Sequence, residues 1–122
     1  MTQEDKNLLF KDLCARLPYD VKGLVAFHKN MAEIQEEIRI IDGKLYDRFA
    51  KFQDSWYDNV TIKPYLFPMS SMTDEQKDFY WNHGIDFGDA WTEVDWLNKN
   101  HIDYRGLIEK GLAIDATCMN IY

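Results

Sequence analysis

A strand end and a helix start lie close together in residues 63–73, which have the sequence KPYLFPMSSMT. Val60, Ile62 and the residues around them predict a strand. Pro64 should end this strand, because proline has no N–H to donate to a central ladder. The segment therefore predicts a rigid exit from a strand, after which the chain enters a helix.

The helix after this exit is predicted to begin with a capping box. Thr73 and Gln76 have the spacing at which each side chain bonds the backbone N–H of the other residue. Three acids favour the positive end of the helix, namely Asp74, Glu75 and Asp78. The helix is predicted to stop near Gly84, and a second helix to run from Asp89 or Thr92 to about Asn100.

A third, short helix is predicted in residues 103–113, which have the sequence DYRGLIEKGLA. Asp103 would cap its start, and Gly111 would end it because glycine adopts a left-handed C-terminal conformation without strain. An anion site at Tyr104 and Arg105 is the alternative to a structural role for these two residues. We favour the structural role, in which the arginine pairs with an acid of its own segment, either Asp103 or Glu109.

The N-terminal residues predict a helix that begins at Thr2, with Asp5 three residues later, and ends at Pro18. Its apolar stripe consists of Leu9, Leu13 and Leu17. Cys14 lies beside this stripe, so we expect a small buried hydrophobe rather than a reactive thiol. Cys14 and Cys118 form no CxxC pair, and we predict no disulfide.

Residues 20–63 are predicted to form an antiparallel sheet. Val21 to Phe27 alternate as a strand does, and Asp42-Gly43 between two apolar-rich runs is a strong signal for a two-residue hairpin turn. In that hairpin the facing pairs would be Ile40 with Leu45, Arg39 with Tyr46, and Glu37 with Arg48.

A helix competes with this hairpin. Asn30 and Glu33 have the spacing of a helix cap, and apolar residues follow at helical intervals, namely Ile34, Ile38, Ile41 and Leu45. The Asp-Gly pair favours strands. The resulting prediction is an α+β fold in one domain, residues 1–122, with an N-terminal helix, a small antiparallel sheet of three or four strands, and short C-terminal helices packed on it.

The charge of the chain is uneven. Residues 1–63 carry eleven acids and ten bases, whereas residues 64–122 carry ten acids and four bases. The acidic half is poorly suited to binding nucleic acid directly and better suited to a basic protein. No apolar run approaches the length of a membrane span, and the start MTQED lacks a secretory pattern, so a cytoplasmic location without membrane contact is expected.

Three blocks carry a resemblance: LCARLPY at residues 13–19, IKPYLFPMSSMT at residues 62–73, and DYRGLIEKGLA at residues 103–113. The chain resembles a family of small uncharacterised proteins encoded by gut Bacteroidales bacteria and by their phages and mobile elements. The likeness covers residues 1–21 and 60–114. Because that family has no established activity, the resemblance implies a fold and a biological setting only.

No catalytic, metal or cofactor site is predicted. Potential metal ligands occur close together, namely His83, Asp86, Asp89, Glu93 and Asp95, but their spacing matches no known loop, and helix capping by Asp86 and Asp89 is the favoured interpretation. The chain contains no motif of a nucleophilic, zinc-protease or phosphate-binding site. A non-enzymatic protein is therefore favoured.

The segment from Asp74 to Trp96 is the predicted binding surface. It contains seven acids against the single base Lys77, together with six large aromatic residues. Helices of this length cannot bury Phe79, Tyr80 and Trp81 all on one side, so some rings should be exposed. Aromatic anchors within a charged rim are typical of protein interfaces. The predicted contact residues are Tyr80, Trp81, Phe87, Trp91, Asp74, Asp78 and Asp89.

These observations favour a cytoplasmic interaction or accessory factor that binds an unidentified, basic protein partner through its acidic, aromatic half. One alternative is a small enzyme whose site is assembled from dispersed histidines and carboxylates. The other alternative is a nucleic-acid adaptor that uses bases near Tyr46 and Phe49, namely Arg39, Lys44, Arg48 and Lys51.

Overall fold

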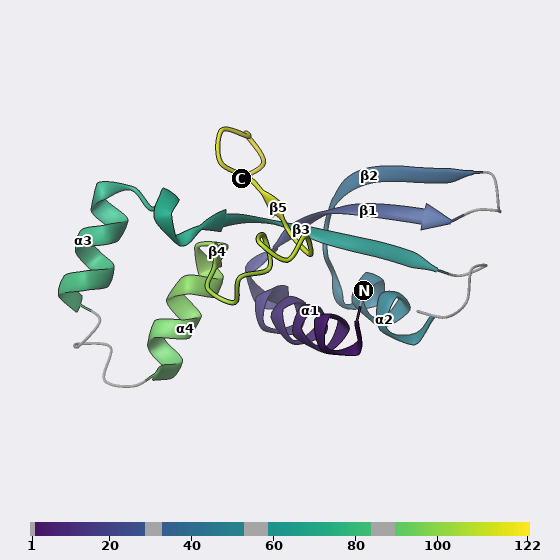
Figure 1. Cartoon of the computed structure of the whole chain (residues 1–122), viewed down its shortest axis with the longest axis horizontal. Helices are drawn as coiled ribbons and strands as arrows, with labels where there is room; N and C mark the ends of the chain where they lie inside the picture. The colour runs from purple at the N-terminus through teal and green to yellow at the C-terminus, as the bar shows by residue number, and fades with distance from the viewer. Residues whose placement is uncertain (1, 29–32, 53–58, 84–89) are drawn as a thin grey trace.

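The computed structural model describes residues 2–28, 33–52, 59–83 and 90–122, with the backbone alone for residues 81–83 and 90–93. In chain order the elements are α1 (Gln3–Arg16), a short 3₁₀ helix (Leu17–Tyr19), β1 (Lys22–His28), β2 (Ile34–Ile40), α2 (Gly43–Lys51), β3 (Val60–Pro68), a second 3₁₀ helix (Met69–Ser71), α3 (Asp74–His83), α4 (Ala90–Lys99), β4 (Ile102–Asp103) and β5 (Ile114–Asp115) (Figure 1). The predicted α+β class is confirmed.

The sheet is mixed rather than purely antiparallel. Its strand order is β2-β1-β3-β4, and β5 also pairs with β3. Strand β1 pairs antiparallel with both β2 and β3, whereas β4 and β5 each pair parallel with β3. Strand β3 therefore runs through both parts of the sheet and links the N-terminal half of the chain to the C-terminal half.

Strand β3 does not end at Pro64, so that prediction is wrong. The antiparallel pairing with β1 ends at the pair Gly23–Pro64, and the parallel pairing with β5 begins at Tyr65. His28 N donates to Asn59 O, and the backbone groups of successive residues alternate in direction, so Pro64 turns its nitrogen away from β1. A proline fits there because no ladder bond from its nitrogen is needed.

Residues 42 and 43 begin a helix instead of forming a hairpin turn. Asp42 is the N-cap of α2, and its Oδ1 accepts a hydrogen bond from Leu45 N at 2.7 Å. Leu45 and Phe49, one helical turn apart, are both buried. The predicted hairpin pairs are therefore wrong: Ile40 pairs with Lys22, and Glu37 with Val25. The competing helix is wrong as well, since residues 34–40 are a strand.

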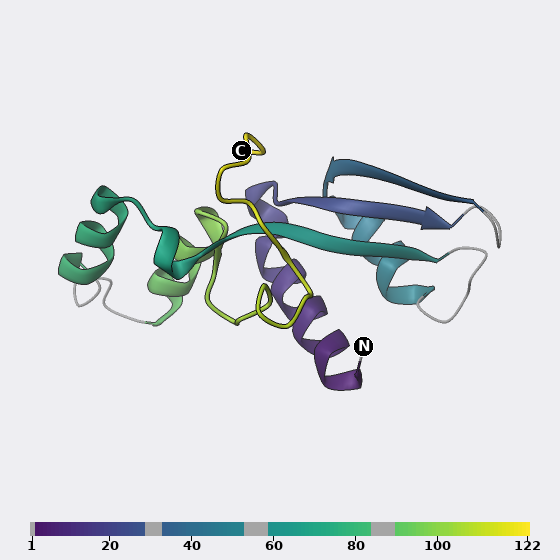
Figure 2. The same ribbon diagram turned by 45° about the horizontal axis from the view of Figure 1, so that its top comes forward.

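The main core lies between the sheet and two helices. Figures 1 and 2 show α1 and α2 on the same side of the β1–β2–β3 sheet. The core is built from Leu9 and Leu13 of α1, Val25 and Ile62 of the sheet, and Phe49 of α2, together with their buried neighbours. Cys14 is exposed, because α1 faces the sheet with its leucine stripe, so the prediction that Cys14 is buried is wrong.

The C-terminal helices follow the sequence signals. Thr73 N donates to Gln76 Oε1 and Gln76 N donates to Thr73 Oγ1, which is the predicted capping box. Helix α4 also lies within its predicted range. A second small core of Met72, Leu97 and Ile102 lies under the two helices. We call α3 and α4 together the α3–α4 arm, and Figure 1 shows it at the opposite end of the molecule from β2.

The third predicted helix is wrong. Residues 107–111 form turns, which the Asp103 carboxylate holds by accepting hydrogen bonds from the N–H groups of Leu107 and Ile108, each at 3.0 Å. Gly111 does adopt the predicted left-handed conformation, with φ 74°. Both oxygens of one buried carboxylate thus fix the segment without the ladder of a helix.

Candidate functional site

The predicted contact residues occupy the α3–α4 arm as far as the structure describes them. Asp74 and Asp78 are exposed on α3, and Tyr80 is half-buried on the same helix. Trp81 and Trp91 lie on α3 and α4, but their side chains are outside the described part of the molecule. The remaining two contact residues, Phe87 and Asp89, lie outside the described residues. The expected helix cap at Asp86 lies outside them as well.

An aromatic stack joins the two helices of the arm. The rings of Phe79 and Trp96 are stacked with centroids 5.2 Å apart, and those of Tyr80 and Trp96 are stacked at 6.0 Å. Tyr80 and Trp96 pack against the small core of the arm. Phe79 keeps 38% of its surface exposed, as expected for a helix too short to bury all its rings. Of these three rings, Phe79 is therefore the one best placed to meet a partner.

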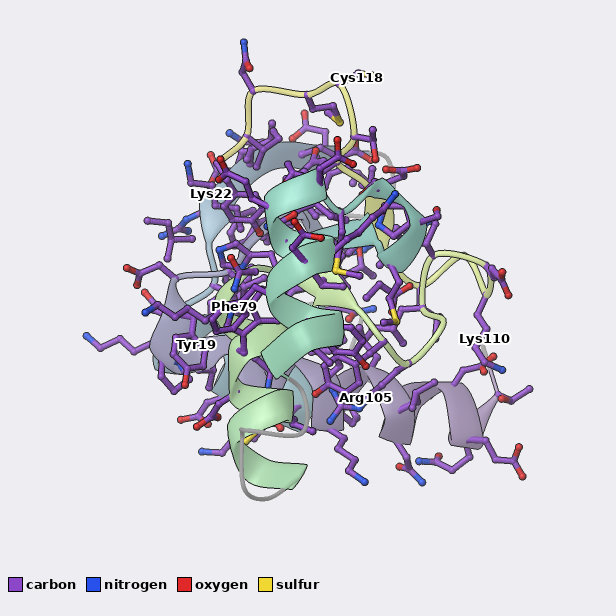
Figure 3. The ribbon with its side chains drawn as sticks, turned by 90° about the vertical axis from the view of Figure 1, so that its left-hand side faces the viewer. Tyr19, Lys22, Phe79, Arg105, Lys110 and Cys118 are labelled. Carbon is purple, nitrogen blue, oxygen red and sulfur yellow. The ribbon has the colours of Figure 1, made fainter. Side chains whose placement is uncertain are left out.

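Three acidic side chains lie beside Phe79 on α3. Glu75 lies one helical turn before Phe79 on the same face of α3, and Asp74 and Asp78 occupy the adjoining stripe. All three carboxylates are exposed. Figure 3 looks onto α3 and shows Phe79 beside it. The arm thus presents an apolar ring within an acidic rim, an arrangement that attracts cationic side chains and can bury an apolar contact among them.

A buried ionic cluster ties α1 to the C-terminal half. Asp12 Oδ2 accepts a hydrogen bond from Arg16 Nε at 2.9 Å, and its Oδ1 accepts one from Arg105 Nη1 at 2.7 Å. Arg16 Nη2 also donates to Ile102 O. Asp12 and Arg16 are fully buried. The expectation that Arg105 pairs within its own segment is wrong, and its partner lies on α1.

Tyr104 belongs to the same cluster. Its ring lies 4.5 Å from the Arg105 guanidinium and 5.4 Å from that of Arg16, and its hydroxyl donates to Asn98 Oδ1 at 3.0 Å. Both guanidinium groups already bind the buried Asp12 carboxylate, one through each of its oxygens. These contacts support the structural interpretation of Tyr104 and Arg105 over an anion site.

A pocket of about 520 Å³ opens between α1, α2 and α4. Its walls include Phe10, Lys11, Cys14, Tyr46, Val94, Asp95, Asn98 and Arg105. Burial, and then the neighbouring Cys14 and Asp47, raise the pKa of Tyr46 above its usual value. Among the described residues that line this pocket there is no histidine. The described lining therefore does not supply the histidine–carboxylate combination that would support the enzyme alternative.

The two histidines whose side chains the structure describes lie on different parts of the fold. His28 ends β1, whereas His101 stacks on Tyr122 with centroids 3.8 Å apart near β4. Burial, and then the charge of Arg16, lower the pKa of His101 to about 4, so its ring is neutral at pH 7. The Tyr122 hydroxyl donates to Tyr65 O at 2.8 Å, and burial raises its pKa to about 12. Within the described residues, no three potential ligands from His, Cys, Asp or Glu lie close enough to hold a metal ion.

Three of the four predicted bases do converge. Arg39, Lys44 and Arg48 line one shallow hollow of about 210 Å³ around Phe27, and both guanidinium groups lie over its ring, at 5.7 and 5.5 Å. Asp42 lines the same hollow, and Glu37 lies 3.6 Å from Arg39. The acids offset much of the positive charge, which weakens the case for a phosphate backbone as ligand.

Comparison of the chain with models of known families, with curated proteins and with solved structures gives no match. Among the helices that the structure describes, none has the length and apolar character needed to cross a membrane.

Proposed function

We propose that this chain is a non-enzymatic cytoplasmic interaction protein that binds a basic protein partner through the α3–α4 arm. Phe79 is the proposed anchor. The acids beside it, Asp74, Glu75 and Asp78, steer the partner during approach. The observation that carries the proposal is that Phe79 is 38% exposed although its ring is stacked on Trp96.

The stack favours binding because it orders the anchor before the partner arrives. A free aromatic side chain loses rotamer freedom when an interface immobilises it, at a cost of about 0.5–1.5 kcal/mol. Phe79 already rests on Trp96, and Trp96 rests on the small core of the arm. Much of that cost is therefore met when the protein folds. An anchor in a central position typically contributes about 2 kcal/mol to binding.

The other predicted contact residues belong to the proposed surface by their place in the sequence, namely Trp81, Phe87, Trp91 and Asp89. The resemblance to proteins of Bacteroidales and their phages and mobile elements adds a proposed setting, in which the partner is a host or phage protein. A surface with this charge does not suit a nucleic acid.

The test is retention of proteins from a cell extract by the immobilised chain and its variants, measured by quantitative mass spectrometry. Phe79→Ala should lower the retention of the specific partner by about 30-fold, as expected for a loss of ~2 kcal/mol. The matched control is Phe52→Ala, because Phe52 is 39% exposed but lies at the end of α2. The double variant D74K/D78K should weaken retention mainly by slowing association.

Equal retention by the wild type, Phe79→Ala and D74K/D78K would contradict the proposal. Loss of retention in Phe52→Ala but not in Phe79→Ala would move the interface to the opposite end of the molecule.

A further inference from the structure

Among the described strands, β2 forms one edge of the sheet, and this edge is open and apolar. It is the terminal strand in the order β2-β1-β3-β4. All three isoleucines of β2 are exposed: Ile34 is 58% exposed, Ile38 50% and Ile40 49%. They lie on the face opposite the main core, because Ile38 pairs with Leu24 whereas the neighbouring Glu37 pairs with the core residue Val25. Such an edge is a template for another strand.

The backbone groups at this edge can be assigned. Ile41 N donates to Val21 O, so the odd-numbered residues of this stretch turn their N–H and C=O groups toward β1. The even-numbered residues then turn theirs to the open edge, namely Ile34, Glu36, Ile38 and Ile40. Among the described strands, β1 is the one that pairs with β2. The open edge therefore presents a regular row of donors and acceptors.

We infer that a second copy of this chain binds this edge, with the two β2 strands antiparallel and Ile38 facing Ile38 of the second copy. In this register Ile38 exchanges both backbone hydrogen bonds with its counterpart, and Glu36 does so with Ile40 of the second copy. By the two-fold symmetry, Ile40 also pairs with Glu36 of the second copy. The interface is isologous and closes on a dimer.

Charge selects this register. Glu37 then faces Arg39 of the second copy, and Arg39 faces Glu37 of the second copy, at non-hydrogen-bonded positions where facing side chains lie closest. The neighbouring registers with the same hydrogen-bonding pattern slide one strand by two residues relative to the other. One of them places Glu37 against Glu37 of the second copy, and the other places Arg39 against Arg39. Both shifted registers oppose like charges and are disfavoured.

Burial of apolar surface and the distribution of charge both favour this dimer. Leu24 lies on the same face as Ile38 with a strand on each side, and it is half-buried, whereas Ile38 at the edge is 50% exposed. A strand from the second copy would give Ile38 a neighbour on its open flank. The acidic α3–α4 arm lies at the opposite end of the molecule, so its charge does not oppose this contact (Figure 1).

The first test is the mass of the full chain in solution, measured by sedimentation equilibrium from about 5 µM to about 1 mM. We expect a reversible monomer–dimer equilibrium that ends at the dimer. A monomer at every concentration overturns the inference and leaves the edge for an extended segment of another protein.

The second test is a charge swap. Glu37→Arg and Arg39→Glu each oppose like charges twice across the two-fold axis, so each should raise the dimer Kd by about tenfold or more. The double variant E37R/R39E restores both pairs and should return the Kd to within about threefold of the wild type. Wild-type Kd values for both single variants would overturn the inferred register, and so would a double variant as weak as the singles.

The third test separates the open edge from the sheet within one chain. Ile38→Pro removes an N–H that points to the open edge and not to β1, so the chain should stay folded by circular dichroism but remain monomeric. Ile38→Val keeps the N–H and should dimerise with a Kd within about threefold of the wild type. A dimer that survives in a folded Ile38→Pro variant would overturn the inference. If that variant does not fold, the charge swap decides.

Discussion

The two ends of this molecule offer partners different kinds of contact. At the sheet end, β2 presents a row of backbone groups and exposed isoleucines. At the other end, the α3–α4 arm presents Phe79 among exposed acids. The charge follows the same division, with eleven acids and ten bases in residues 1–63 but ten acids and four bases in residues 64–122. Salt should therefore weaken contacts at the arm more than contacts at the sheet edge.

Strand β3 and one buried carboxylate connect the two ends. The first part of β3 pairs with β1, and its last residues pair with β5 and β4. Asp12 adds a second connection through Arg16 and Arg105. Different contact surfaces can thus belong to one cooperatively folded unit, and stability measurements can test whether they do.

The largest expected effect comes from Asp12→Ala. The substitution leaves Arg16 fully buried without its carboxylate partner, so we expect the free energy of unfolding to fall by about 3–5 kcal/mol. Chemical denaturation with urea measures this change. Glu4→Ala, an exposed acid on the same helix, is the control and should change it by less than about 0.5 kcal/mol. A loss below about 1 kcal/mol for Asp12→Ala would show that the cluster does not hold the two ends together.

An intermediate effect is expected from pH. The pKa of His101 is lowered from 6.5 to about 4, so the unfolded chain binds a proton at this residue more readily than the folded protein does. The contribution of His101 to stability is complete above pH 6.5 and is lost as pH falls toward 4. Urea unfolding at several pH values should show this slope. His101→Phe keeps a ring for Tyr122 to stack on and should flatten it; an unchanged slope in this variant would assign the effect to other groups.

The smallest expected effects come from two helix caps, one at each end. Asp42→Ala removes the cap of α2, and Thr73→Ala removes the cap of α3. Each should lower the free energy of unfolding by about 1 kcal/mol. Hydrogen exchange distinguishes cooperative from separate unfolding. If the ends unfold together, Thr73→Ala accelerates exchange in the core amides of β1 as much as Asp42→Ala does; exchange that rises in the arm alone would show that the ends unfold separately.

Local signals in the sequence predicted much of the fold. Thr2 with Asp5, and Thr73 with Gln76, form the caps that their spacing predicts. Capping depends on residues a few positions apart, so it can be inferred without tertiary structure. Asp42 shows the limit of such inference, because an aspartate before glycine suits both a hairpin turn and a helix cap. Leu45 and Phe49, which are both buried, have helical spacing. This spacing is the signal in the sequence that favours the helix cap over the hairpin turn.

Long-range contacts could not be predicted. Asp12 pairs with Arg105, which is 93 residues away, and Tyr65 pairs with Ile114 across the parallel part of the sheet. No local spacing encodes such partners. The same limit applies to the candidate site: the acids of α3 were expected to be exposed, but choosing Phe79 as the anchor required knowing that its ring lies outermost on Trp96.

The most direct test of two distinct contact surfaces is photo-crosslinking in a cell extract. Benzoylphenylalanine is placed at position 79 in one preparation and at position 38 in another, and the adducts are identified by mass spectrometry. We expect position 79 to yield an adduct with a different protein that high salt suppresses, and position 38 to yield an adduct of twice the mass of the chain that high salt reduces much less, because backbone hydrogen bonds and apolar contacts accompany its Glu37–Arg39 pairs. Homodimer adducts from position 79, or the same foreign adduct from both positions, would contradict the account.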